Sequence, residues 1–204
     1  MRFWMHFKMA RLISRQIAEN GVEIDGLLFT LGNLAPDMTF SYVFRRHTRQ
    51  VSLPHLQKQI RHLYGEGSDP YKVRFSWHLG VMSHYVCDFL CYPHTPAFDG
   101  TTASHFLHEA RQSVHGGDML PLRNRKSKGL NEAGLTAALD RYIERHERLL
   151  SQNSDEKYME VPIAMYAAAW ASSGAYFYAV QKSACNPLPR LRRYIPIDIP
   201  RSSA

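Results

Sequence analysis

Residues 73–90 read VRFSWHLGVMSHYVCDFL, and this stretch decides the fold class. Its length corresponds to about five turns of an α-helix, and its apolar residues cover nearly every side of that helix. A helix that is apolar all round is buried among other elements and does not lie on a surface. Pro93 and Pro96 follow and end the helical pattern. The stretch therefore predicts a central helix that is surrounded by others.

The sequence on either side supplies further helical patterns, in which apolar residues recur at three- and four-residue spacing. A short apolar run at 24–31 is expected to close at Gly32-Asn33, with Pro36 and Asp37 at a turn or a helix start. No segment shows the strict apolar alternation of a half-buried strand, so we expect an all-α, multi-helix bundle. The predicted helices are 3–18, 53–64, 73–90, 102–114, 131–150 and 155–182.

Size and composition are those of one ordinary globular domain. The chain has 204 residues, 45% of them hydrophobic and 21% charged, which is close to the average for such domains. We expect a single all-α metal-binding domain at 1–185 and an irregular, proline-rich and basic tail at 186–204. The run from Val161 to Val180 is rich in Ala, Ser, Gly and Tyr, which favours a buried core helix over a membrane span.

Charge and cysteine content point to the partners and the compartment. The net charge of +7 favours anionic partners such as phosphates, phospholipid surfaces or nucleic acid. Three cysteines do not make a disulfide framework and suit a reducing compartment. Charged residues interrupt the N-terminal sequence before an apolar run of signal-peptide length develops. We therefore expect a cytoplasmic protein.

Two pairs of possible metal ligands stand at helical spacing. His84 and Asp88 lie four residues apart, as do His105 and Glu109, so each pair can direct an imidazole and a carboxylate toward one point. His94 lies between the pairs, just after the end of the central helix. Neutral imidazole and carboxylate suit Zn²⁺, although manganese or iron would accept a similar set.

One such pair alone is more often structural than metal-binding, but two pairs with a histidine between them favour a metal site. Four stretches then resemble the zinc-dependent phospholipases C, a family whose fold and metal site are shared with the zinc-dependent single-strand nucleases. Their order and spacing match the family, most closely over the first 110 residues. They are His6, Gly32-Asn33-Leu34-Ala35-Pro36-Asp37 with Arg46-His47, His84-Tyr85-Val86-Cys87-Asp88 with Tyr92-Pro93-His94, and His105-Phe106-Leu107-His108-Glu109.

The resemblance implies a set of ligands for each ion. One zinc ion would be held by Asp37, His47, His84 and Asp88. A second would be held by His94, His105 and Glu109. For a third ion the matching residues are His6 and Asp88, but in the secreted relatives that site also uses a processed N-terminal tryptophan. Here Trp4 is internal, so two ions are expected and a third is possible.

The resemblance also implies the chemistry, which is hydrolysis of a phosphoric ester by water activated at the zinc cluster. Asp37 would orient or deprotonate that water, and Arg45 or Arg46 could add positive charge for the phosphate. A phospholipase C-like phosphodiester hydrolase is the first hypothesis, with a phospholipid as a possible substrate and peripheral membrane contact as a possible property. A nuclease or phosphatase with the same metals, and a metal-binding protein without catalysis, remain alternatives, nucleic acid being the less favoured partner.

The other histidines are expected to be structural or exposed. His78 lies six residues from His84, about 240° round the helix, and so faces away from the predicted site. His108 is the substitute ligand should His105 prove wrong. The rest lack partners at ligand spacing and are interpreted as surface or capping residues; they are His55, His62, His115 and His146.

Overall fold

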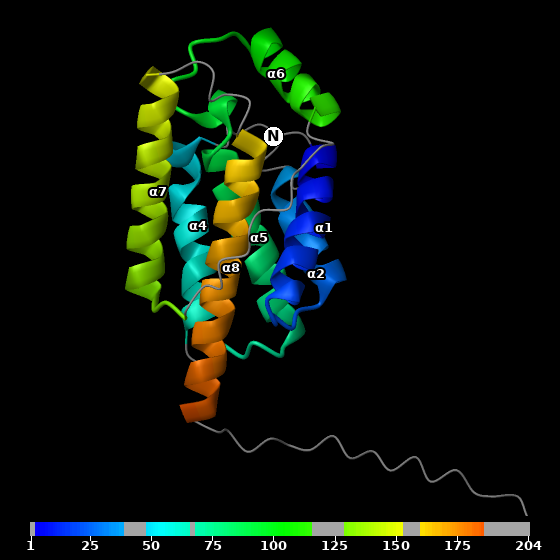
Figure 1. The fold of residues 1–204 in the computed structure, drawn as a ribbon, viewed down its shortest axis with the longest axis vertical. Coiled ribbons are helices and arrows are strands. Elements are labelled where there is room, and N and C mark those ends of the chain that lie inside the picture. The colour runs from blue at the N-terminus through cyan, green and yellow to red at the C-terminus, as the bar shows by residue number, and fades with distance from the viewer. Residues whose placement is uncertain (1–2, 39–47, 66–67, 116–128, 153–159, 186–204) are drawn as a thin grey trace, which may run out of the picture.

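The computed structural model describes residues 3–38, 48–65, 68–115, 129–152 and 160–185. Within these ranges the chain forms seven α-helices and a short 3-10 helix, and no strand. Most of the helices run along one long axis, and α6 lies across one end of the bundle (Figure 1). The predicted all-α bundle is confirmed.

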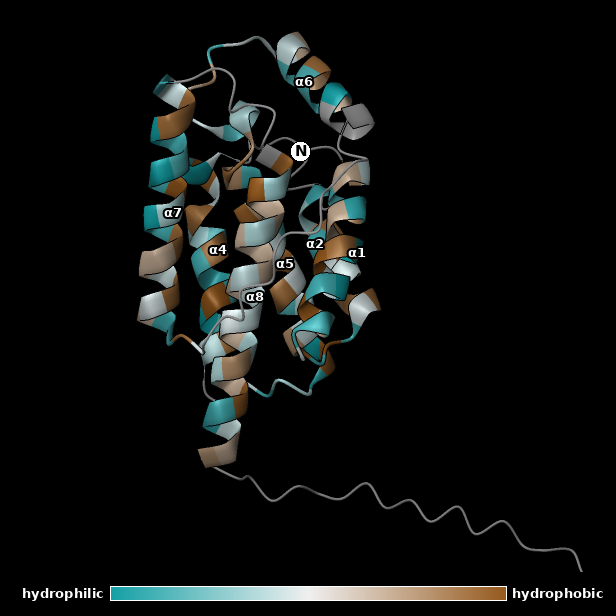
Figure 2. Ribbon diagram, in the orientation of Figure 1, coloured by the Kyte–Doolittle hydropathy of each residue, from teal (hydrophilic) through white to brown (hydrophobic). Residues whose placement is uncertain are grey.

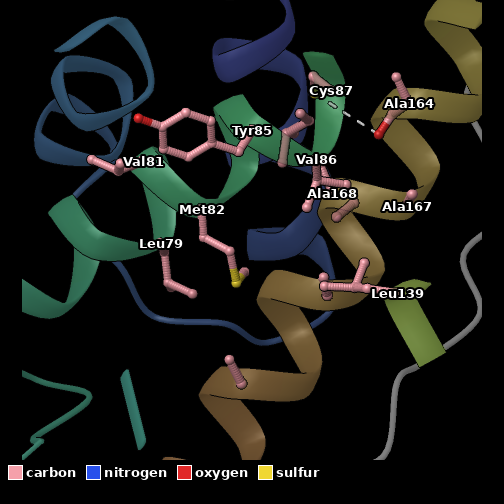
Figure 3. Close-up of a cluster of buried hydrophobic side chains, with 14 of the residues drawn as sticks. Leu79, Val81, Met82, Tyr85, Val86, Cys87, Leu139, Ala164, Ala167 and Ala168 are labelled. Carbon is pink, nitrogen blue, oxygen red and sulfur yellow. Dashed lines mark hydrogen bonds between the residues drawn. The ribbon is translucent and has the colours of Figure 1, made fainter. Parts of the chain in front are cut away.

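Helix α5 (Val73–Phe89) is the centre of this bundle. It packs against α2 (Gly26–Met38), α4 (Arg49–Tyr64) and α8 (Glu160–Cys185). Every residue from Leu79 to Phe89 is buried, as the all-round apolar pattern predicted. Figure 3 shows side chains of α5 packed against small alanines of α8, which allow the two helices to approach closely.

The remaining helices lie around this centre at nearly the predicted positions. Helix α1 (Phe3–Glu19) packs against α2 and α8, and α7 (Glu132–Gln152) against α4 and α8. The outer helix α7 is amphipathic, with hydrophilic and hydrophobic residues on different faces (Figure 2). Helix η1 (Tyr92–His94) and α6 (Thr102–His115) follow the end of α5.

The expected stop at Gly32-Asn33 is wrong, because α2 continues through both residues and through Pro36 to Met38. Gly32 is instead the point where α2 crosses α5. A Cβ on Gly32 would lie 2.3 Å from the Trp77 carbonyl oxygen, and a Cβ on Gly80 would lie 2.1 Å from the Phe29 carbonyl oxygen. The close packing outweighs the weak helix propensity of glycine. As a result, Asp37 is carried on a regular helix that is fixed against α5.

Helix α4 begins at Arg49, four residues earlier than the predicted start at Leu53. The Arg49 guanidinium reaches α7, where it lies 3.0 Å from Asp140, 3.3 Å from Glu144 and 3.4 Å from Glu147. These three carboxylates occupy one face of α7 at helical spacing. A long-range charge cluster of this kind leaves no periodic signal near Arg49, so sequence periodicity could not have placed the helix start.

Two further expectations concern the ends of the chain and the membrane. In the parts that the structure describes, no helix combines the length and the hydropathy needed to cross a membrane. Residues 186–204 lie outside the described residues, as do 155–159, where the last helix was predicted to begin. The division into a domain at 1–185 and a tail therefore stays a prediction.

Candidate metal centre

Five elements bring their histidines and carboxylates together near one end of the bundle (Figure 1). His6 lies in the first turn of α1, and Asp37 lies in the last turn of the neighbouring α2. His84 and Asp88 occupy the last turns of α5. The remaining candidates come from the two elements that follow α5, namely His94 from η1 and His105 and Glu109 from α6.

We call His6, Asp37, His84 and Asp88 the inner cluster. Donor atoms of His6, Asp37 and His84 all lie within 4.8 Å of one another. Asp88 faces both histidines, with Oδ1 3.0 Å from His6 Nε2 and Oδ2 3.2 Å from His84 Nε2. His6, His84 and Asp88 are fully buried, whereas the Asp37 side chain is 17% exposed. Asp37 is thus the inner residue that solvent can reach.

The backbone of α2 fixes the His84 ring. His84 Nδ1 donates a hydrogen bond to the Asn33 carbonyl oxygen at 2.8 Å, because a carbonyl can only accept. In the neutral ring this leaves the lone pair of Nε2 directed at Asp37 and Asp88. Nε2 lies 3.9 Å from Asp37 Oδ1 and 3.2 Å from Asp88 Oδ2. A carbonyl that holds one imidazole nitrogen while the other points at carboxylates is the usual support of a metal-ligating histidine.

The protonation states of His6 and Asp88 also suit a cation. Burial, followed by the neighbouring His84, lowers the pKa of His6 to about 4, so this ring is neutral at pH 7. Burial alone would raise the pKa of Asp88, but its interactions with His94, His84 and His6 hold it well below its usual range. Neutral imidazole and ionised carboxylate are the forms that bind zinc.

Without a cation, the inner cluster leaves polar atoms poorly satisfied. A neutral His84 presents a lone pair to a carboxylate oxygen, which is an unfavourable contact between two acceptors. A cation among these donor atoms turns that contact into two favourable ones. The donor set of the inner cluster therefore fits a metal ion.

We call His94, His105 and Glu109 the outer cluster. Glu109 Oε1 lies 2.9 Å from His105 Nε2 and 3.4 Å from His94 Nε2, and donor atoms of all three residues lie within 4.8 Å of one another. Burial would raise the pKa of Glu109, but the hydrogen bonds from His105 and His94 lower it, so the carboxylate is ionised. His94 and Glu109 are buried, while the His105 side chain is 30% exposed.

The two clusters influence each other through Asp88. Burial lowers the pKa of His94, and the negative charge of Asp88 opposes that effect. His94 in turn helps to keep Asp88 ionised. Asp88 thus lies within electrostatic reach of both groups of ligands, as a carboxylate shared between neighbouring ions does.

The structure brings seven of the eight predicted ligands into these two clusters. His47, together with Arg45 and Arg46, lies outside the described residues. His6 was assigned with Asp88 to a third ion, yet its donor atom also lies beside Asp37 and His84. Sequence reasoning missed the supporting role of Asn33. The hydrogen bond uses the backbone carbonyl of Asn33, and no side-chain pattern in the sequence marks a carbonyl.

The excluded histidines take other roles. His78 Nδ1 lies 2.7 Å from Gln59 Oε1, and its ring stacks on His62. His146 was expected to be at the surface or in a cap; it is 3% exposed, and its Nε2 donates to the Leu90 carbonyl at the end of α5. His55 and His108 are partly exposed. The side chain of His115 is outside the description.

Comparison with known proteins places this geometry in a family. Neither a curated protein nor a solved structure matches the chain significantly. The family model described as zinc dependent phospholipase C matches residues 5–173. The match extends well beyond the first 110 residues and includes both clusters together with α7 and half of α8. A zinc-dependent family and two buried groups of histidines and carboxylates together support a metal-dependent hydrolase. The chain belongs to the zinc-dependent phospholipase C family.

Proposed function

We propose that this protein is a zinc-dependent phosphodiesterase that hydrolyses phospholipids in the manner of a phospholipase C. The observation that carries the proposal is the convergence of two clusters of imidazoles and carboxylates, connected through Asp88. Paired metal ions suit displacement at phosphorus because they can stabilise the attacking and the leaving oxygen together.

Each cluster would hold one zinc ion. His84 and Asp88, with Asp37 and the predicted ligand His47, would hold the first, and the outer cluster would hold the second. His6, beside Asp88, is available for a third ion or for the first. Zinc bound here would polarise the phosphoryl group and lower the pKa of a water.

Asp37 is the residue best placed to handle the proton of the attacking water. Its carboxylate is 17% exposed, whereas the other side chains of the inner cluster are fully buried. Asp37 would accept the proton as the water oxygen forms its bond to phosphorus. The phosphorus–oxygen bond to glycerol breaks, and the diacylglycerol oxygen takes up a proton as it leaves.

Exposed apolar side chains beside the ligands favour lipid over nucleic acid. Trp4 is 67% exposed and stands two residues before His6, and Met38, at 65%, directly follows Asp37. Phe106 and Leu107, next to His105, are 55% and 53% exposed. Exposed apolar side chains that stand within two residues of the ligands can form an interaction surface, and an aromatic such as Trp4 suits the membrane interface. We call these four residues the apolar rim.

Zinc content and substrate choice test the proposal together. The protein, purified without chelators, is analysed for zinc and is then offered phosphatidylcholine vesicles, single-stranded DNA and p-nitrophenyl phosphate. We expect two or three zinc ions per chain and release of diacylglycerol from the vesicles. Cleavage of DNA alone would indicate a nuclease, and cleavage of the monoester alone a phosphatase. Zinc without any hydrolysis would indicate a binding protein; each of these three results overturns the proposal.

The apolar rim is tested with a matched pair of variants. Trp4→Ala with Phe106→Ala should slow hydrolysis of vesicles about tenfold or more, because each aromatic contributes on the order of 1.5–3 kcal/mol when buried. The same variant should leave a short-chain, monomeric phospholipid nearly unaffected. Leu27→Ala is the control, since Leu27 is 69% exposed at the opposite end of α2 from Asp37. Equal loss on both substrates would show that the rim acts on the site itself and not on the membrane.

A further inference from the structure

A cavity of about 550 Å³ lies between α7 and α8, and no metal-cluster residue lines it. This volume is within the range of small-molecule sites. Its apolar lining comprises Tyr142, Ala138 and Leu139 of α7 with Tyr166, Ala167 and Trp170 of α8. All three aromatics are only partly buried. The cavity therefore has an apolar surface that solvent or a ligand can reach.

The α7 wall of the cavity also carries positive charge. Arg141, Arg145 and Arg148 line the cavity at positions i, i+4 and i+7 of α7, which places them on one face over about 10 Å of the helix axis. Among the described residues, none of the three guanidinium groups has a carboxylate within 4.0 Å. Arg148 Nε makes a long hydrogen bond of 3.4 Å to the Glu144 backbone carbonyl.

The one acidic residue in the lining does not neutralise this wall. The Glu144 carboxylate lies 3.3 Å from Arg49 on α4, and Arg49 also forms ion pairs with Asp140 and Glu147. The acidic face of α7 is thus engaged by α4, while its arginine face is left over the cavity. A cluster of unpaired cations beside exposed aromatic surface is complementary to an anion with an apolar body.

We propose that the α7–α8 cavity binds an amphiphilic organic anion, with its apolar part against Tyr166 and Trp170 and its acidic group at Arg141, Arg145 and Arg148. Charge argues against the two other possible occupants. The chain's own terminal segment, 186–204, carries Arg190, Arg192 and Arg193, and a second copy brings a net charge of +7; like charges repel both from this wall. Two sources share the proposed chemistry, a fatty acid and an aromatic anion such as a nucleotide.

Fluorescence of 1-anilinonaphthalene-8-sulfonate, an amphiphilic anion, measures binding to the zinc-loaded protein. We expect saturable binding with one site per chain. Laurate and AMP are then added as competitors: displacement by laurate assigns the site to lipid acids, and displacement by AMP to aromatic anions. Failure of both to displace the dye, or binding that does not saturate, overturns the proposal.

Variants locate the site. Arg141→Gln with Arg145→Gln should weaken dye binding at least about tenfold, because hydrogen bonds to charged groups are lost. Arg61→Gln with Arg74→Gln removes the same charge from other exposed positions of α4 and α5 and should have little effect. Ala167→Phe, which fills the cavity, should also abolish binding, with helix content by circular dichroism unchanged. Equal weakening in both double variants would mean that net charge, and not this cavity, attracts the dye.

Discussion

The inner and outer clusters contain the same kinds of donor atom, but different structures hold them. The inner cluster lies on α1, α2 and α5, which pack tightly against one another, and α2 supports His84 through the Asn33 carbonyl. The outer cluster lies on the 3-10 helix η1 and on α6, which crosses the end of the bundle (Figure 1). His105 there is 30% exposed, while His84 is fully buried.

This difference shows that a helical bundle can hold the ligands of one metal site more rigidly than those of another. Side chains that are locked by packing and by supporting hydrogen bonds lose little freedom when they bind an ion. We therefore expect the inner cluster to bind zinc more tightly and to depend on the core. The outer cluster should depend mainly on its own ligands. Four changes test this contrast.

The largest effect is expected from Gly80→Ala at the crossing of α2 and α5. The added Cβ would meet the Phe29 carbonyl oxygen at 2.1 Å and the Asn33 nitrogen at 2.8 Å, so the two backbones must separate. We expect a loss of about 3 kcal/mol or more in the free energy of unfolding, measured by urea denaturation. Gly26→Ala is the control, because a Cβ there meets no atom within 4 Å. Unchanged stability in Gly80→Ala would show that the inner cluster does not depend on this crossing.

The next effect is expected from Asp88→Asn, which removes the carboxylate that faces both inner histidines. Loss of one buried charged partner costs about 3–5 kcal/mol, which corresponds to at least about a hundredfold weaker zinc binding. Calorimetric titration of the metal-free protein with zinc measures this change in zinc affinity. Because Asp88 also acts on His94, the second ion should weaken too, by a smaller factor. If Asp88→Asn binds both zinc ions with unaltered affinity, Asp88 is not part of the metal site.

A smaller effect is expected from Glu109→Gln in the outer cluster. This change should weaken the binding of one zinc ion by about tenfold. The loss is limited because water can reach the partly exposed His105 and compensate part of the lost interaction. The inner ion should be retained, so elemental analysis after dialysis should fall by one zinc per chain. Loss of both ions would mean that the two clusters form a single cooperative site. The control on the same helix is Arg111→Gln, because Arg111 is exposed.

The smallest effect concerns His78, which lies outside both clusters. Burial, followed by the charges of His62, Arg74 and Lys58, lowers its pKa to about 4, compared with 6.5 when unfolded. The unfolded chain therefore binds more protons between pH 6.5 and 4, so stability is lost as the pH falls through this window. His78→Gln should flatten that loss in metal-free protein by less than about 1 kcal/mol, since the ring is partly solvated. Identical pH profiles of the two proteins would exclude the effect.

Part of the site could be predicted from sequence because helical spacing is a local property. His84 with Asp88 and His105 with Glu109 are one turn apart, and any helix through them presents each pair on one face. The distances of 3.2 Å and 2.9 Å within these pairs agree with that expectation. That α1 and α2 would bring His6 and Asp37 to the same place came from the family resemblance, since spacing says nothing about separate helices.

Other features could not be predicted, because they depend on which helices touch. Gly32-Asn33 has the local chemistry of a helix end, yet α2 continues through it where Gly32 packs closely against Trp77 on α5. Arg49, at the start of α4, contacts three carboxylates that lie about 90 residues further along the chain. His84 and His146 each donate to a backbone carbonyl of a residue far away in the sequence, Asn33 and Leu90 respectively.

The sequence by itself determined the all-α class, the central helix at 73–90 and the ligand pairs, because helical periodicity and residue chemistry are local properties of the chain. Only the tertiary structure decided how the pairs combine into an inner and an outer cluster and which histidines lose their charge. It also decided that the arginines of α7 at the cavity have no carboxylate within 4.0 Å among the described residues. The physical reason is that pKa shifts, helix crossings and ion pairs arise from neighbours in space, and one-dimensional spacing does not specify those neighbours.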